Sequence, residues 1–74
     1  MQKAVELSIW REDDLPTVEQ AFAAVCVCQW LSNGFQPIYV FRYDSSRQIM
    51  YILAGTNENI QIIIPPNGFW EERQ

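Results

Sequence analysis

The chain has 74 residues, a net charge of −4 and 49% hydrophobic residues. A chain of this length forms a single domain and buries only ~60% of the surface that its unfolded state exposes, so it needs good packing or a partner to be stable. Its few basic residues are scattered along the sequence, which disfavours a nucleic-acid-binding protein because phosphate binding needs a clustered basic face.

The cysteine and histidine content argues against a disulfide or a metal site. Cys26 and Cys28 are two positions apart in a predicted helix, so their side chains project ~200° apart and cannot form a disulfide within one chain. The chain has no histidine, and neither a metal ion nor a cofactor is expected. Free thiols, the lack of a signal-peptide pattern and the lack of a membrane-length apolar run predict a cytoplasmic protein.

Residues 1–14 are predicted to form an N-terminal arm or an edge strand, followed by a single α+β domain at residues 15–74. Val5, Leu7 and Ile9 alternate with other residues in the pattern of a strand, although a loose arm fits the same residues. The acidic residues Glu12 to Asp14 precede a helix, where negative charge complements the helix dipole. We interpret them as favourable flanking charge.

A helix of about four turns is predicted between Thr17 and Gly34. Thr17 and Gln20 have the spacing of a capping box, in which each side chain binds the backbone N–H of the other residue. Gly34 is predicted to take the left-handed conformation of a C-terminal cap, with Phe35 packing back on Trp30.

This helix is apolar on nearly all sides. Ala24, Val27 and Leu31 lie opposite a second apolar face formed by Val18, Ala21, Phe22 and Val25. A surface helix normally has one apolar stripe, so the helix is either enclosed on two sides or part of an interface. Gln29 falls on the second face, where its amide is expected to bind a neighbouring backbone edge.

Three antiparallel strands are predicted within residues 37–64, joined by turns at Asp44–Arg47 and Gly55–Glu58. A first turn closed by Asp44 and Arg47 places Val40 opposite Tyr51 and Phe41 opposite Met50. The second turn places Leu53 opposite Ile60, Tyr51 opposite Ile62 and Ile49 opposite Ile64. Phe69 and Trp70 are the candidates for a short fourth strand.

This register predicts which face of the sheet the helix covers, and which face is left for a partner. The helix-facing residues are predicted to be Ile38, Val40, Ile49, Tyr51, Leu53, Ile60, Ile62 and Ile64. The opposite face is unusually apolar for a solvated one. Aromatic residues and methionine are enriched at protein interfaces, so this face is the predicted partner interface. It consists of Tyr39, Phe41, Tyr43, Met50, Ile52 and Ile63.

Four stretches of the chain resemble a family of short uncharacterised, mainly cyanobacterial proteins, a domain of unknown function. They are the segments 28–33 (CQWLSN), 37–44 (PIYVFRYD), 51–55 (YILAG) and 66–70 (PNGFW). The likeness covers roughly Leu15 to Trp70 and implies no catalytic residue and no cofactor. It also implies a second small gene beside this one, so a two-gene pair is conceivable.

The residues favour a non-catalytic protein-interaction module that forms a homodimer or binds a small partner protein. A competing hypothesis is a small toxin-like ribonuclease, or another member of a toxin–antitoxin-like pair, that uses Arg42, Tyr43, Asp44 and Arg47. It is disfavoured because the chain is acidic and lacks histidine, and both cysteines are expected to be inert core thiols. A third possibility is a monomer whose N-terminal strand covers the aromatic face.

Overall fold

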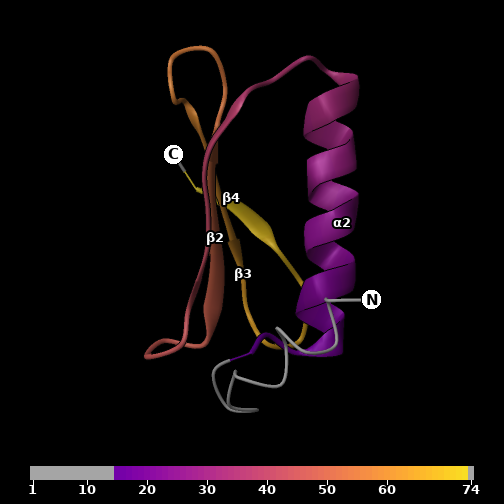
Figure 1. The fold of residues 1–74 in the computed structure, drawn as a ribbon, viewed down its shortest axis with the longest axis vertical. Helices are drawn as coiled ribbons and strands as arrows, with labels where there is room; N and C mark the ends of the chain where they lie inside the picture. Colours follow the sequence, from indigo (N-terminus) through magenta and orange to yellow (C-terminus); the bar gives the residue numbers. More distant parts are fainter. Residues whose placement is uncertain (1–14, 74) are drawn as a thin grey trace, which may run out of the picture.

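The computed structural model describes residues 15–73, which form one helix followed by an antiparallel sheet (Figure 1). The elements are α2 (Val18–Asn33), β1 (Ile38–Asp44), β2 (Ile49–Ala54), β3 (Ile60–Ile64) and β4 (Glu71–Arg73). The strands lie in the order β1-β2-β3-β4, so each pairs with its neighbour along the chain. The predicted α+β meander is confirmed, whereas the predicted arm at residues 1–14 lies outside the described residues.

The first turn of α2 is fixed by the predicted capping box. Thr17 Oγ1 accepts a hydrogen bond of 3.0 Å from the N–H of Gln20, and Gln20 Oε1 accepts one of 2.9 Å from the N–H of Thr17. Gln20 is fully buried, and its Nε2 donates to the carbonyl oxygens of Gln48 at 2.9 Å and Ile64 at 3.0 Å. The backbone-binding role predicted for Gln29, which is exposed, therefore belongs to Gln20.

The C-terminal cap of α2 lies one residue later than predicted. Gly34 has φ −90°, whereas Phe35 takes the left-handed conformation with φ 56°. The N–H of Gln36 donates to the Leu31 carbonyl, a bond that closes this kind of cap. Phe35 is 91% exposed, so its predicted packing on Trp30 is wrong; the Trp30 ring instead lies 5.9 Å from that of Trp70.

The strand register differs from the prediction at both hairpins. Asp44 pairs with Ile49 instead of Arg47, so the pairing of Val40–Asp44 moves by two residues and keeps the predicted faces. The register shifts between Ile38 and Val40, which places Ile38 opposite Ala54. Ala54 pairs with Ile60, a one-residue difference that reverses the faces of β3 relative to β2. Glu58 in the second loop takes φ 56°, a conformation that its residue type does not predict.

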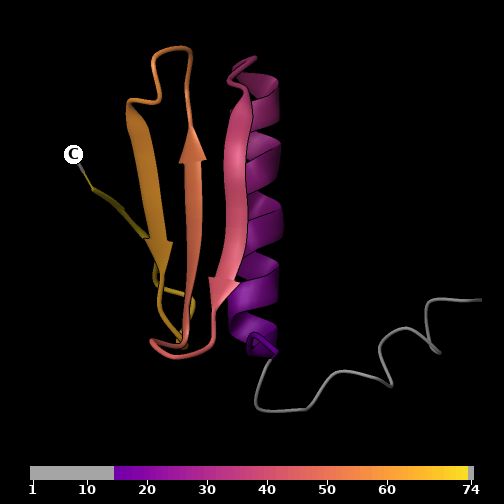
Figure 2. The same ribbon diagram turned by 60° about the vertical axis from the view of Figure 1, so that its left-hand side comes forward.

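This register decides which side of the sheet α2 covers, called the covered face below. The helix packs on one side of the sheet (Figure 1), and in Figure 2 β1 lies in front of it. The predicted covered face is correct for β3 and wrong for β2, where Met50, Ile52 and Ala54 face the helix in place of Ile49, Tyr51 and Leu53. In β1 it is correct for Ile38, which pairs with buried Ala54, and wrong for Val40, because the register shifts between these two residues. Full burial of one isoleucine contributes ~1.5 to 3 kcal/mol. The core consists of Ala24, Val27, Leu31, Met50, Ile52, Ala54, Ile62 and Ile64.

The segment between β3 and β4 lies along one side of α2. Thr17 Oγ1 donates to the Pro66 carbonyl at 2.7 Å. Gly68 has φ 81°, and a Cβ at this position would lie 2.8 Å from the Glu19 carbonyl oxygen. A glycine is therefore required where this segment crosses the helix backbone.

Candidate functional site

The six residues of the predicted partner interface do not share one exposed face. Tyr39 and Phe41 are about half exposed on β1, and Tyr43 is half-buried. Met50 and Ile52 belong to the core under α2, and Ile63 lies on the opposite side of the sheet. The prediction of a single six-residue surface is wrong because the register places Met50 and Ile52 beneath the helix. A partner contact at Tyr39, Phe41 and Tyr43 stays a prediction.

An exposed apolar surface does exist, and it joins the outer side of α2 to β1. On α2, Val18 is 68% exposed, Phe22 69% and Val25 64%. We call these three residues, with Phe41, the α2–β1 surface. It adjoins an apolar groove of about 370 Å³, lined by Pro16, Ala21, Ala24, Val25, Cys28, Phe41 and Met50.

Strand β1 also offers a free backbone edge within residues 15–73. It bonds to β2 on one side and to no other strand of the described chain. Its seven residues, Ile38–Asp44, include neither proline nor lysine, which proteins commonly use to block edge pairing. The register shifts between Ile38 and Val40, so the regular part of this edge is Val40–Asp44. The edge and the α2–β1 surface together form a region suited to a protein partner.

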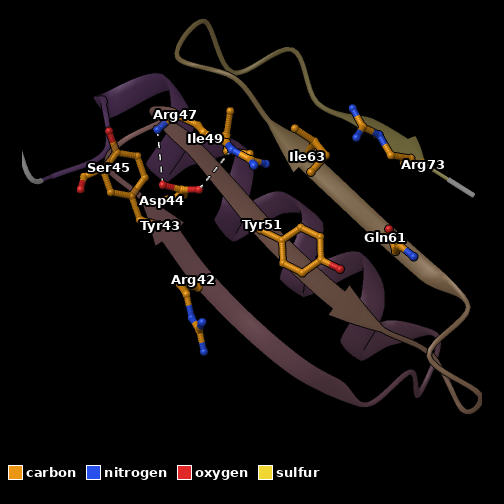
Figure 3. A pocket seen from close by; sticks show the side chains of 10 residues that line it. All are labelled: Arg42, Tyr43, Asp44, Ser45, Arg47, Ile49, Tyr51, Gln61, Ile63 and Arg73. Atoms are coloured by element: carbon orange, nitrogen blue, oxygen red, sulfur yellow. Dashed lines mark hydrogen bonds and ion pairs between the residues drawn. The ribbon is translucent and has the colours of Figure 1, made fainter.

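The side of the sheet away from α2, called the open face below, has a different chemistry. A hollow of about 720 Å³ lies on it, lined by Arg42, Tyr43, Asp44, Ser45, Arg47, Ile49, Tyr51, Gln61, Ile63 and Arg73. The basic residues of the described chain are Arg42, Arg47 and Arg73, and all three line this hollow. In Figure 3, Arg47 and Arg73 extend toward the hollow from two sides, whereas Arg42 extends outward from β1.

Asp44, at the rim of this hollow, is held by the β1–β2 turn. Its Oδ1 accepts hydrogen bonds from Ser46 Oγ at 2.7 Å, from the Ser46 N–H at 3.1 Å and from the Arg47 N–H at 3.3 Å. Its Oδ2 lies 3.8 Å from Arg47 Nε. The Ser46 hydroxyl, then the two N–H groups and the charge of Arg47, lower the pKa of Asp44. This carboxyl group is therefore ionised at neutral pH and serves to fix the turn.

The two thiols lie in different surroundings. Both cysteines are free, as predicted, but Cys26 is exposed and only Cys28 is half-buried. The prediction of two core thiols is thus wrong for Cys26, which lies on the outer side of α2. Burial raises the pKa of Cys28 and so disfavours its reactive thiolate.

Within residues 15–73, no three His, Cys, Asp or Glu side chains gather closely enough to hold a metal ion. Within the same residues, no helix combines the length and the apolar character that crossing a membrane requires.

Comparison with known proteins identifies the family. Residues 15–71 match the family described as "Domain of unknown function (DUF6888)", and the chain belongs to it. Neither a curated protein nor a solved structure matches the chain.

Proposed function

We propose that this member of the DUF6888 family is a non-catalytic protein-interaction module that pairs with a second copy of itself through the α2–β1 surface. The observation that carries the proposal is the exposure of Phe22 and Phe41, 69% and 53%, beside an apolar groove. Large exposed apolar patches on small proteins are commonly interaction sites. The free edge of β1 supports the same proposal, since two copies of one strand can pair antiparallel about a two-fold axis.

Sedimentation velocity over a wide concentration range tests the proposal. The wild-type chain is expected to approach twice its 8.7 kDa mass as its concentration rises. Phe41→Asp is expected to weaken association at least tenfold, because the substitution places a charge in a buried contact. Phe69→Asp is the matched control, since Phe69 is 80% exposed outside the α2–β1 surface.

A wild-type chain that stays monomeric at every concentration would overturn self-association. The α2–β1 surface would then be assigned to a different small protein. Co-expression with the product of the small neighbouring gene that the family resemblance implies would test that assignment. If Phe41→Asp and Phe69→Asp weaken association equally, the α2–β1 surface is not the contact between the two copies. Circular dichroism of both variants separates loss of association from loss of folding.

Ribonuclease activity is a second candidate, favoured by one observation. Arg42, Tyr43, Asp44 and Arg47 all line the hollow on the open face. Against it, Asp44 is engaged in the turn and has a lowered pKa, which makes it a weak base at neutral pH. We therefore rank ribonuclease activity below self-association. Its test is RNA cleavage by the wild-type chain and loss of that cleavage in a folded Arg47→Ala variant.

A further inference from the structure

The three arginines of the described chain are gathered around one hollow although they are far apart in sequence. Arg42 comes from β1, Arg47 from the β1–β2 turn and Arg73 from β4. Within residues 15–73, the one ion pair they form joins Arg47 to Asp44 over 3.8 Å, and the Arg47 side chain is 77% exposed. Such a long, exposed pair is weak, so it leaves most of the positive charge available to an anion.

The floor of the hollow is apolar and partly aromatic. Ile49, Tyr51 and Ile63 are half-buried at the centre of the open face, where no described element covers them. The volume of about 720 Å³ lies in the range of small-molecule sites. A ligand that fills this hollow therefore needs a flat apolar part as well as negative charge.

We propose that this hollow binds a phosphorylated ligand that carries a flat ring, the class to which mononucleotides belong. Arg47 and Arg73 extend toward the hollow from two sides and can bind one phosphate group between them (Figure 3). The planar guanidinium group of arginine matches phosphate oxygens two at a time, and a phosphate monoester carries enough charge for two such groups. The ring of the ligand packs on Tyr51 and Ile63.

A small ligand fits these residues better than a nucleic-acid strand does. A strand needs a basic track that follows several phosphates. Here Arg47 and Arg73 flank a single hollow, and β4 places Glu71 beside Ile63 on the same face. Carboxylates around the hollow would repel the additional phosphates of a strand, whereas one phosphate group fits between the arginines.

Titration of the full chain with adenosine monophosphate, adenosine and inorganic phosphate tests the ligand class. Amide chemical shifts in NMR report both the affinity and the place of binding. The monophosphate is expected to bind at least tenfold more tightly than either adenosine or phosphate, with the largest shifts in β2, β3 and β4. Equal binding of phosphate alone would overturn the role of the ring, and equal binding of adenosine would overturn the role of the arginines.

A charge-matched pair of variants tests the site. Arg73→Gln and Gln29→Glu change the net charge by the same amount, but Gln29 is an exposed residue of α2 on the other side of the sheet. Arg73→Gln is expected to weaken binding of the monophosphate about tenfold, because it removes a charge-assisted contact. Gln29→Glu is expected to change it less than about twofold. An equal loss in both variants would show a general charge effect and overturn the site.

This proposal does not rest on self-association. Phe41→Asp is expected to leave the affinity for the monophosphate unchanged, since Phe41 lies on the covered side of the sheet. A Phe41→Asp variant that is monomeric and still binds the monophosphate would show that ligand binding and self-association are independent. Loss of binding in this folded variant would overturn a site contained in one chain.

Discussion

The two faces of the sheet have similar side chains and different surroundings. Along β2, Met50, Ile52 and Ala54 are buried under α2, whereas Ile49, Tyr51 and Leu53 alternate with them and are half-buried on the open face. Both sets are apolar, so composition alone does not distinguish them. The pairing register and the position of one helix decide which set becomes the core.

The largest contrast is expected between two isoleucines on opposite faces. Ile52 is fully buried and Ile63 is half-buried. Ile52→Ala should lower the free energy of unfolding by about 3 to 4 kcal/mol, because it leaves a cavity, and Ile63→Ala by about 1 kcal/mol. Urea denaturation of both variants measures the difference. Equal losses would mean that the open face is covered in solution.

Two glutamines of α2 sharpen the comparison between the inner and outer sides of the helix. Gln20→Ala removes hydrogen bonds to the carbonyl groups of Gln48 and Ile64 and leaves the Ile64 carbonyl buried without this partner. This variant should lose about 2 to 3 kcal/mol of unfolding free energy. Gln29→Ala, on the exposed side, should change it by less than about 0.5 kcal/mol. Thermal and urea denaturation measure both, and a similar loss in the two variants would contradict the placement of Gln20.

A smaller effect is expected at Asp44, at the rim of the open face. Hydrogen bonding by Ser46 lowers the pKa of Asp44 in the folded chain, so the ionised group stabilises the fold at pH values above its ordinary pKa of ~3.9. This contribution is lost as the pH falls through the folded pKa. The stability difference between wild type and Asp44→Ala should therefore be largest near neutral pH and shrink in acid. Urea denaturation from pH 7 to pH 3 checks this, and a constant difference would contradict it.

The smallest contrast concerns the rates at which a reagent modifies the two thiols, and it involves no change in the stability of the fold. Cys26 is exposed, whereas burial raises the pKa of Cys28. A thiol reagent at mildly alkaline pH should modify Cys26 first and Cys28 more slowly. Mass spectrometry of peptides over a time course measures the two rates. Faster modification of Cys28 would show that the groove beside it opens to solvent.

The sequence was sufficient for local structure. The capping box of Thr17 and Gln20 and the alternation of β1 predicted α2 and the meander correctly. These features depend on neighbouring residues, and their signals are well understood. The two apolar faces of α2 were also found, and Phe22 and Val25 are on the face that stays exposed.

The sequence was insufficient where the backbone takes rare conformations. Phe35, Gln48 and Glu58 have positive φ, although glycine, asparagine and aspartate are the residues that usually signal it. Each of these residues lies at a cap or a turn. Glu58 lies in the β2–β3 loop, whose length decides which β3 side chains share a face with those of β2. The arginine-lined hollow was missed for another reason: Arg73 follows Arg47 by a long stretch of chain, and the pairing of β3 with β4 brings it onto the same face.

The bonds of Gln20 also set an order of events during folding. Its amide binds the carbonyl of Ile64, which is 44 residues away in the chain. The three longer strands pair through short connections and can form early, because local contacts close with little loss of chain entropy. The helix, although it is synthesised before these strands, cannot complete its docking until Ile64 has been made. Until then both of its apolar sides face solvent, so a nascent chain is most prone to aggregate at this stage.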